Sequence, residues 1–536
     1  MNRRQAIRLV TVSGAGLFLL RCSGTNARTF PVKLNGASAE RGHRLREAGT
    51  GKPSRIEHEG VIIVGGGVAG LSAAGALKEG GVDDLLVLEL EDEVGGNARS
   101  GANAHGRFPL GAHYLPVPET SDDRLIAFLG SCGSIIGRTQ EGLPVYNEEH
   151  LCGDPHERLF HRGQWRSGIR PRSGLSAADE AQFDRFERMV EDLRQVKGED
   201  GRWAFAIPVD ASSTSEDTEA LRRLDDISFS DWLAQLGFSA PALLWYLDYS
   251  CMDDLGAPAQ QVSAWAGLHY FAARRGYGAN AEQGSVLTWP EGNDFLVNAL
   301  KRPVKDHTRT AALVRSVRSS GETVEVDVEH MDTGEMVRYT ARHVVLSVPQ
   351  FIASRILGPV GERRAAGLEY APWVVVNLTL ERPPEERGGE PMAWDNVLFG
   401  SKSLGYVNAS HQRLDHPRSV ILTHYRALTG RTPRLARELV AGVEIAQWVD
   451  DAVAELEQVH PDIRDRILEA EVAIWGHGMI VPIPGFIHGG VRRELQRPIG
   501  GRIHFAHSDL SGMSLFEEAF HHGSRVAQEI LSGWPA

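Results

Sequence analysis

An unbroken apolar run that leads into a cluster of glycines is the strongest pattern in the chain. Residues 61–64 are all large and aliphatic, residues 65–70 read Gly-Gly-Gly-Val-Ala-Gly, and residues 71–77 are leucines and small residues typical of a closely packed helix. A second apolar run at residues 85–88 ends at Glu89. Continuous apolar strands of this kind are buried on both faces, as in parallel sheets. The pattern predicts a strand–turn–helix–strand unit of an α/β fold.

In two later regions the apolar residues are spaced differently. In residues 309–348, apolar and polar positions alternate, and Gly321 and Gly334 mark turns, which predicts a three-stranded β-meander. Between these blocks, residues 179–196, 228–236 and a segment from Pro241 onwards have helical spacing. We therefore expect a parallel-sheet domain that is interrupted by a mainly helical insertion.

Composition narrows the class of protein. The 536 residues contain 57 Lys+Arg and 70 Asp+Glu, a net charge of −13, with 42% hydrophobic residues. These values are typical of a soluble globular protein and exclude a disordered, collagenous or multi-span membrane chain. The acidic balance argues against nucleic acid as a partner, because phosphate binding needs clustered Lys and Arg. No two cysteines form a Cys-x-x-Cys pair, so we predict no zinc or other metal site, and free thiols are favoured over a Cys132–Cys152 disulfide.

The spacing of the glycines is that of a dinucleotide-binding turn. Gly65 permits the tight turn, Gly67 lets the backbone approach a pyrophosphate, and Gly70 lets the helix pack against the strand. The start of the helix offers unpaired N–H groups to the anion. Glu89, about 20 residues further on, can accept hydrogen bonds from ribose hydroxyls. The residues predicted to bind the ligand here are Gly65, Gly67, Val68, Ala69, Gly70 and Glu89.

The next stretch identifies the ligand through a family resemblance. Residues 89–100 read Glu-Leu-Glu-Asp-Glu-Val-Gly-Gly-Asn-Ala-Arg-Ser, which resembles the Glu-x5-Gly-Gly-x-x-x-Ser extension of FAD-dependent enzymes in the flavin amine oxidase superfamily. Nicotinamide-only dehydrogenases lack this extension, so the resemblance implies FAD. Relatives carry arginine directly after the double glycine, where this chain has Asn97, and the resemblance implies that Gly96 and Asn97 bind the cofactor. We expect Arg99, two residues further on, to lie near the flavin or the pyrophosphate.

The resemblance also implies a discontinuous architecture. We expect a Rossmann-like FAD-binding domain from residues 58–115, 291–350 and 470–536, and an α+β substrate domain from residues 116–290 and 351–469. In the meander, Val314 occupies the place where relatives offer backbone contacts to adenine, although a core position is equally open. Near the C-terminus, Asp509 corresponds to an acid that binds a ribityl hydroxyl, and Ser508-Asp509 resembles the bacterial spermidine dehydrogenase branch.

Candidate substrate contacts come from the insertions and from positions beside the flavin blocks. Residues 243–271 combine aromatic rings with Asp248, Asp253 and Asp254, which suits an ammonium group held by charge and cation–π contact. The resemblance implies that residues near 113 and 475–479 face the substrate or the ring. The candidates for catalysis are His477, Trp475, Trp265 and His113, and a packed structural role is the alternative for each.

These features together predict hydride transfer from the carbon of a cationic amine to flavin, followed by hydrolysis of the imine. A desaturase acting on carotenoid or porphyrinogen substrates and a non-catalytic flavin-binding protein are the alternatives. Many amine oxidases carry a lysine on a substrate-domain strand, and the comparable residues 372–380 contain none, which favours a dehydrogenase with an unknown electron acceptor.

The N-terminus predicts export. Arg3-Arg4 and Arg8 precede a short, weakly apolar stretch of residues 9–20, which resembles a twin-arginine (Tat) signal and is too short for a stable membrane span. We expect residues 1–27 to be the signal and 28–57 a linker, with a periplasmic location. Membrane attachment through a lipidated Cys22 is the minority alternative.

Overall fold

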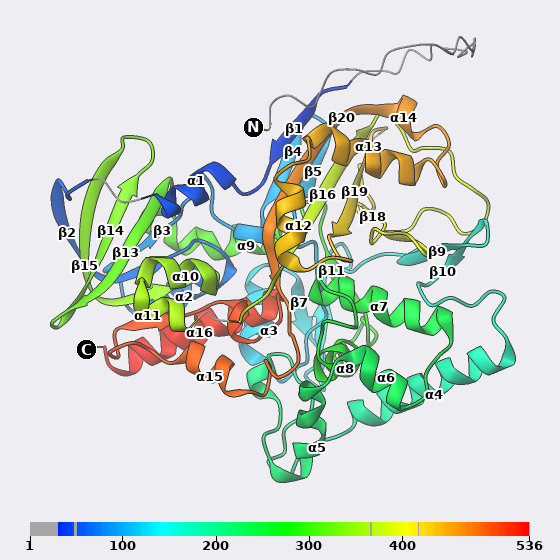
Figure 1. The fold of residues 1–536 in the computed structure, drawn as a ribbon, viewed down its shortest axis with the longest axis horizontal. Helices are drawn as coiled ribbons and strands as arrows, with labels where there is room; N and C mark the ends of the chain where they lie inside the picture. Colours follow the sequence, from blue (N-terminus) through cyan, green and yellow to red (C-terminus); the bar gives the residue numbers. More distant parts are fainter. Residues whose placement is uncertain (1–29, 48–50, 365–366, 416–417, 535–536) are drawn as a thin grey trace, which may run out of the picture.

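The computed structural model describes residues 30–47, 51–364, 367–415 and 418–534, and it has a mixed α/β fold built on two large sheets (Figure 1). A seven-stranded sheet lies on the left of Figure 1, an eight-stranded sheet at the upper right, and a group of helices at the lower right. The α/β class predicted from the glycine unit is confirmed.

The seven-stranded sheet combines a parallel part and a meander. Its parallel strands are β12 (Thr308–Arg309), β3 (Leu85–Leu88), β2 (Arg55–Val64), β15 (Glu335–Leu346) and β21 (Ile503–Phe505). β13 (Ala312–Ser320) and β14 (Thr323–His330) add to β15 as an antiparallel meander. The last four residues of β2, which begin at Val61, include three side chains with no exposed surface, as expected for a strand covered on both faces.

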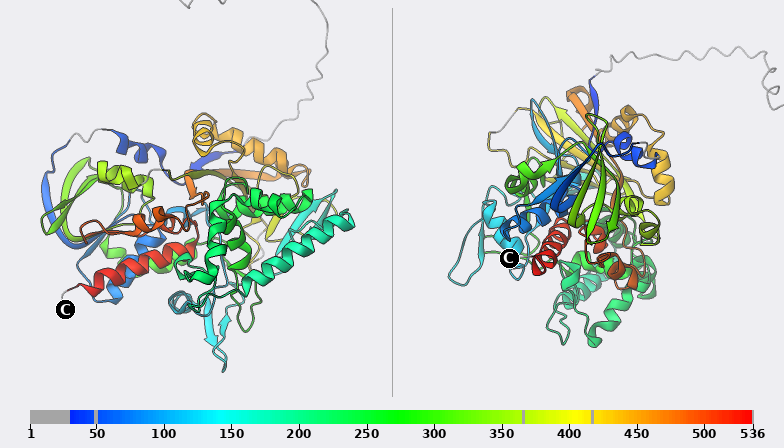
Figure 2. Two further views of the ribbon diagram at one scale, coloured as in Figure 1. Left: turned by 60° about the horizontal axis from the view of Figure 1, so that its bottom comes forward. Right: turned by 90° about the vertical axis from the view of Figure 1, so that its left-hand side faces the viewer.

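Two helices from opposite ends of the chain cover one face of this sheet. α2 (Val68–Glu79) and α16 (Phe516–Ser532) lie against each other, with Ser72 Oγ donating to Phe520 O at 3.0 Å. A Cβ on Gly523 would lie 2.2 Å from Ala69 O, so only glycine permits this close helix crossing. α9 (Asp294–Lys301) packs beside α2. The left view of Figure 2 shows α16, in red, running beneath the sheet.

The eight-stranded sheet is assembled from distant parts of the chain. In order, its strands are β1 (Val32–Asn35), β20 (Ile467–Ile480), β16 (Tyr370–Leu380), β19 (Val420–Ala427), β18 (Tyr406–Asn408), β17 (Asp395–Leu398), β9 (Glu157–His161) and β10 (Gln164–Ser167). Every residue of β16 is buried. α12 (Pro433–Val440) and α13 (Ile445–Leu456) pack on one face.

The helical group contains the helices that the sequence predicts. They are α4 (Ala177–Arg194), α6 (Phe229–Gln235), α7 (Pro241–Leu255) and α8 (Ala264–Ala272). α4 begins with a capping box between Ser176 and Asp179, and α7 begins with Pro241 and ends at Gly256 in the left-handed conformation.

Short two-stranded sheets and small helices join these parts. The strand pairs are β4 (Ser100–Asn103) with β5 (Gly106–Pro109), β6 (Tyr114–Pro116) with β11 (Val286–Thr288), and β7 (Ile135–Arg138) with β8 (Pro144–Tyr146). The remaining α-helices are α1 (Ala39–His43), α3 (Asp123–Ser131), α5 (Glu219–Arg222), α10 (Gln350–Leu357), α11 (Pro359–Arg364), α14 (Ile463–Arg466) and α15 (Gly490–Gln496).

Two expected boundaries are wrong. The segment predicted as a linker contains β1, which pairs in parallel with β20, and also the start of β2. β20, placed in the third flavin block by the resemblance, lies in the eight-stranded sheet, because its residues pair with β16 along most of their length. No helix among the described residues is long and apolar enough to cross a membrane. The predicted Tat signal lies outside the described residues.

Candidate active site

The glycine turn after β2 opens into a cavity of ≈ 310 Å³, here called the glycine-loop cavity. Gly65, Gly67, Val68 and Ala69 line it. A Cβ on Gly67 would meet no atom within 4 Å and would project into open space. Gly67 is also the N-cap of α2 and offers no side-chain cap, so the first N–H groups of the helix are free to bind an anion.

Gly70, unlike the other predicted glycines of the turn, does not line the cavity. It is buried in α2, away from the cavity lining, and a Cβ there would lie 1.9 Å from Gly65 O. The residue therefore permits the helix to approach the turn, which is the packing role that the motif predicts.

Glu89 lies at the end of β3 and lines the same cavity. Its carboxylate accepts the Gly66 N–H at 2.7 Å and the Glu91 N–H at 2.9 Å. Burial raises the pKa of Glu89, while these two hydrogen bonds and the positive charge of Arg99 oppose the rise. A carboxylate held in this way retains lone pairs for a hydroxyl group in the cavity.

The double glycine brings Asn97 and Arg99 to the other side of the turn. Gly95 and Gly96 both have a positive φ and line the cavity together with Asn97. The Asn97 side chain donates to Gly478 O at 2.8 Å. Arg99 is buried and is not part of the lining, and its Nε has no hydrogen-bond partner within the described part of the chain.

Asp509 closes the cavity opposite the glycine turn. It is 2% exposed, and its carboxylate accepts the Tyr370 hydroxyl at 2.6 Å and the Gln350 N–H at 2.8 Å. Burial alone would raise the pKa of Asp509, but His507, 3.0 Å away, and these hydrogen bonds hold it below its usual value. Gly67 and Asp509, which are far apart in the sequence, thus line one cavity. Val314 of β13 lines it as well.

Unpaired polar atoms indicate that this cavity fits a polar ligand. Asn293 lines the cavity, and its buried Oδ1 has no partner among the described residues. α16 begins at Leu515–Phe516 on the cavity wall without a side-chain cap, which adds a second helix N-terminus. Two helix N-termini, a carboxylate at a strand end and an orphaned acceptor suit a molecule that carries both phosphate and hydroxyl groups.

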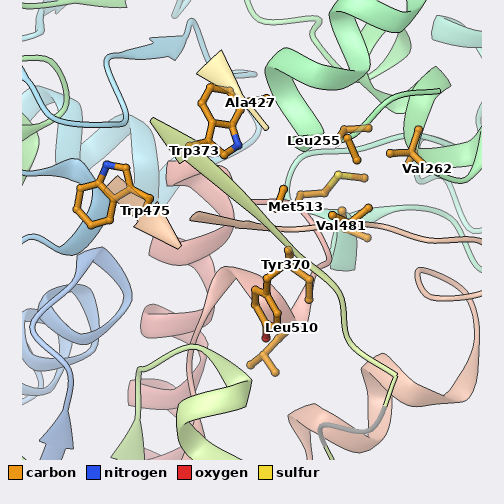
Figure 3. Close-up of a cluster of buried hydrophobic side chains, with 14 of the residues drawn as sticks. Leu255, Val262, Tyr370, Trp373, Ala427, Trp475, Val481, Leu510 and Met513 are labelled. Atoms are coloured by element: carbon orange, nitrogen blue, oxygen red, sulfur yellow. The ribbon is translucent and has the colours of Figure 1, made fainter. Parts of the chain in front are cut away.

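A second cavity of ≈ 140 Å³, here called the tryptophan cavity, adjoins the first and shares Asn97, Asn293 and Gly478 with it. Trp373 of β16 and Trp475 of β20 stand directly opposite each other across the paired strands and form part of its wall (Figure 3). Trp475 Nε1 donates to Leu110 O at 2.6 Å, which fixes the indole.

Two of the predicted histidines lie beside these cavities as neutral groups. His113 lines the tryptophan cavity, and its ring stacks on Tyr425 at 4.5 Å. Burial lowers the pKa of His113 to about 4. His477 lines the glycine-loop cavity and stacks on Phe351 at 4.1 Å, and burial together with nearby arginines lowers its pKa to about 4. Neither histidine carries a charge at neutral pH.

Carboxyl groups line the tryptophan cavity. Asp254 forms an ion pair with Arg274, whereas Asp253 and Glu517 have no ion pair in the described ranges. Burial, reinforced by Asp254, raises the pKa of Asp253 to about 7. Burial likewise raises the pKa of Glu517 to about 8. These two groups exchange protons near neutral pH. Of the acids that the sequence singled out, Asp248 instead accepts the Ala259 N–H at 2.8 Å and has a structural role.

A third cavity of ≈ 290 Å³, here called the acid cavity, adjoins the tryptophan cavity and shares His113, Asp253 and Tyr425 with it. Glu157 of β9 and Asp395 of β17 line it, together with Trp394 and several tyrosines. Sequence reasoning missed Glu157, Asp395, Trp394 and Tyr425, because they lie on or directly before strands without a motif and meet only through sheet pairing.

One predicted catalytic residue is misplaced. Trp265 has no exposed surface, its ring stacks on Phe205 at 5.2 Å, and it lines none of the three cavities. Helical spacing placed Trp265 and His269 on one face of α8 correctly, but that face packs into the core, and His269 bonds Ala206 O at 2.8 Å.

The described residues include one trio with metal-ligand geometry, formed by Asp210, His521 and His522. Arg492 contacts the Asp210 carboxylate directly, and His522 bonds Ser511 at 2.7 Å. These partners already occupy the groups that a cation would need. The three described cysteines are free thiols.

Comparison with protein families gives a match over most of the chain. The model of the family described as flavin containing amine oxidoreductase matches residues 68–531. The matched range begins at Val68, the first residue of α2, and extends through most of α16.

Individual relatives match shorter stretches. Polyamine oxidase 7 of rice (Oryza sativa subsp. japonica) is 38% identical over 68 residues, which is 13% of this chain and 13% of the rice protein. Carotenoid 3,4-desaturase of Haloarcula japonica is 32% identical over 109 residues, 20% of this chain and 19% of that protein. The chain thus matches less than a fifth of the length of either protein.

Among solved structures, a putrescine oxidase determined with bound putrescine superposes with a TM-score of 0.65 at 18% identity, covering 89% of this chain and 100% of that one. At this identity the likeness shows the fold.

Proposed function

Because the chain belongs to the family of flavin-containing amine oxidoreductases, we propose that it oxidises a small cationic amine, polyamines among the candidates, with FAD as its cofactor. The observation that carries the proposal is the tryptophan cavity, which joins the glycine-loop cavity and combines indole walls with carboxyl groups. Aromatic faces and carboxylates are the groups that recognise an ammonium ion.

The glycine-loop cavity has the groups that FAD needs. The N-terminus of α2 at Gly67–Ala69 would hold the diphosphate, and Glu89 would accept hydroxyls of the adenosine ribose. Arg99, with its unpaired Nε, would supply positive charge near the double glycine. Asp509 retains lone pairs for a ribityl hydroxyl. When bound, FAD supplies the acceptor for the hydride that leaves the amine carbon.

The residues of the tryptophan cavity prepare the amine. An amine must lose its ammonium proton before its lone pair can expel hydride, and burial between Trp373 and Trp475 disfavours the charged form. Asp253 and Glu517 can accept a proton at their carboxylate oxygens near neutral pH. His113 and His477 are neutral and contribute shape and stacking.

A desaturase would need an apolar channel for a long polyene. The acid cavity next to the tryptophan cavity is lined by Glu157, Asp253 and Asp395, so it is unsuited to such a substrate. The amine substrate is therefore the better supported of the two proposals.

Anaerobic titration of the purified holoprotein tests the proposal. We expect the yellow protein to release FAD on denaturation, and monoamines or polyamines to bleach its visible absorbance under nitrogen. Polyenes and amino acids should leave the absorbance unchanged. A colourless protein that cannot be reconstituted with FAD, or an FAD-containing protein that no amine bleaches, would contradict it; the latter result would favour a non-catalytic flavin protein.

We further propose that the electrons pass to an acceptor other than oxygen. Supporting this, no lysine of the described ranges lines the three cavities, and β16 contains none. After bleaching, a quinone or dye should restore the absorbance faster than air-saturated buffer does. Faster reoxidation by air would identify an oxidase.

Export to the periplasm through the Tat machinery is a separate proposal, supported by Arg3-Arg4 and the short apolar stretch after them. The R3K/R4K double variant should remain in the cytoplasm, whereas the wild-type chain should appear in the periplasmic fraction. Equal distribution of the two chains would refute the proposal.

A further inference from the structure

Three carboxylates converge on the acid cavity from three separate elements. Asp395 of β17 and Glu157 of β9 are direct partners in the parallel ladder, so their side chains leave the same face of the sheet side by side. Asp253 reaches the same cavity from α7. The cavity, at ≈ 290 Å³, is larger than the neighbouring tryptophan cavity at ≈ 140 Å³.

The described residues supply no cationic partner for these carboxyl groups. None of the three takes part in an ion pair within the described part of the chain. The two arginines on the cavity wall are already engaged: Arg274 pairs with Asp254, and Arg194 donates to Glu191 at 3.3 Å and to Phe271 O at 2.9 Å. Burial raises the pKa of Asp395 well above its usual value, and repulsion from Asp253 and Glu157 adds to the rise.

Half-buried carboxyl groups without an ion-pair partner are costly, and they mark places where a cation from outside completes the structure. The remaining walls indicate what kind of cation fits. Aromatic rings surround the acids, with Tyr249, Tyr270 and Trp394 among them. Ring faces contact an alkylammonium chain favourably, whereas a hydrated metal ion would gain little from them.

The acid cavity adjoins the proposed reaction site. His113, Tyr114 and Tyr425 form walls of both the acid cavity and the tryptophan cavity, and Asp253 faces both. A molecule that fills both cavities must carry an amine at the tryptophan end and a positive charge at the acid end.

We infer that Glu157, Asp253 and Asp395 bind the distal ammonium group of a diamine or longer polyamine, whose reacting carbon lies in the tryptophan cavity. This assignment rests on the proposed amine oxidation, and it makes the acid cavity the determinant of substrate class. A monoamine of the same carbon chain leaves the three carboxylates unpaired and binds more weakly.

A pair of substrates with the same carbon skeleton tests the assignment. The rates of anaerobic bleaching by 1,4-diaminobutane and n-butylamine are compared for the wild-type holoprotein and for the E157Q, D395N and E157Q/D395N variants. These substitutions keep the shape of the side chain and remove its ability to carry a negative charge. D192N, which removes an exposed acid on α4, is the matched control. FAD content and melting temperature verify that each variant is folded.

We expect each single variant to lose about tenfold in kcat/KM for the diamine, and the double variant about 100-fold, as for charge-assisted hydrogen bonds. Values for n-butylamine should change less than about threefold, and D192N should match the wild type. Equal losses for both substrates, or no loss for the diamine, would overturn the assignment while leaving amine oxidation intact.

Calorimetry on dithionite-reduced holoprotein gives a readout without turnover. We expect 1,4-diaminobutane to bind the reduced wild type and to bind the double variant at least about tenfold more weakly. If Ca²⁺ or Mg²⁺ alone binds the wild type at these residues and the diamine does not compete, the cavity is a metal site and the assignment is wrong. Should no amine bleach the flavin, the proposed function fails, and calorimetry still decides whether the acid cavity binds a diamine.

Discussion

The hydroxyl of Tyr370 donates to the carboxylate of Asp509 at 2.6 Å, and this bond joins the eight-stranded sheet to the segment that closes the glycine-loop cavity. Tyr370 begins β16, and its ring is visible in Figure 3 next to Leu510. Asp509 precedes α16, whose first residues form the far wall of the cavity. The bond therefore ties the eight-stranded sheet to the wall of the proposed cofactor site.

Removal of this hydroxyl should loosen the site. In Y370F the buried carboxylate of Asp509 loses a donor, so its pKa should rise and the free energy of unfolding should fall by about 1–3 kcal/mol. Urea unfolding and FAD retention on gel filtration measure the effect. Y277F, at a tyrosine that is 48% exposed, is the control. A Y370F protein as stable as Y277F would show that the bond contributes nothing.

The crossing of α2 and α16 gives a prediction with an internal control. A Cβ at Gly523 would lie 2.2 Å from Ala69 O, so G523A should separate the helices and lower the free energy of unfolding by about 1–3 kcal/mol. Gly75 lies in the partner helix α2, but a Cβ there meets nothing within 4 Å, and G75A should raise stability by up to about 1 kcal/mol. Denaturant midpoints of the two variants should lie on opposite sides of the wild type; a shift in the same direction would refute the crossing.

The sequence predicted the glycine unit well because its requirements are local. One βαβ unit contains the turn at Gly65–Gly70, the following helix and the acid at Glu89. The role of each residue in this unit follows from its position in the motif and does not depend on distant parts of the chain. The placement of Asp509 in the same cavity came from the family pattern, since nothing in the local sequence indicates which distant strand it meets.

The acid cavity could not be predicted from the sequence, because it depends on contacts between distant strands. Glu157 and Asp395 come together only because β9 pairs with β17, and neither strand carries a motif that specifies its partner. The prediction for Trp265 was wrong for a different reason. Helical spacing shows that residues share a face of a helix, but it does not show whether that face borders a cavity or the core. β1 was missed because a four-residue edge strand gives too short a pattern.

Two glycines of one turn should separate cofactor binding from folding. G67A places a methyl group in the open cavity, so the apoprotein should keep its stability while its affinity for FAD falls by about tenfold or more. G70A places a methyl group 1.9 Å from Gly65 O and should destabilise the apoprotein itself. Fluorescence titration with FAD and urea unfolding of both apoproteins distinguish the two effects. Loss of apoprotein stability in G67A would contradict its place on the cavity wall.

The charge state of Asp253 should govern diamine affinity around neutral pH. Its pKa of about 7 results from burial and from repulsion by Asp254 and Glu157, with Arg274 acting in the opposite direction; Asp395 faces it across the acid cavity. Below pH 7 the carboxyl group is mostly neutral, and above pH 7 it is mostly ionised. Alkylammonium groups resemble lysine, with pKa values near 10, so the ligand stays charged over this range.

Binding of 1,4-diaminobutane to the reduced holoprotein should therefore tighten as the pH rises from 6 to 8, by about tenfold, since the ionised fraction of a group with this pKa grows by about that factor. Removal of the titrating group in D253N should flatten the dependence, and D192N should keep it. n-Butylamine has no second ammonium group for the acid cavity and meets Asp253 only from the tryptophan cavity, so its affinity should change less with pH than that of the diamine. An undiminished pH dependence in D253N would assign the titration to another group, such as Asp395 of the acid cavity or Glu517 of the tryptophan cavity, because burial raises the pKa of both.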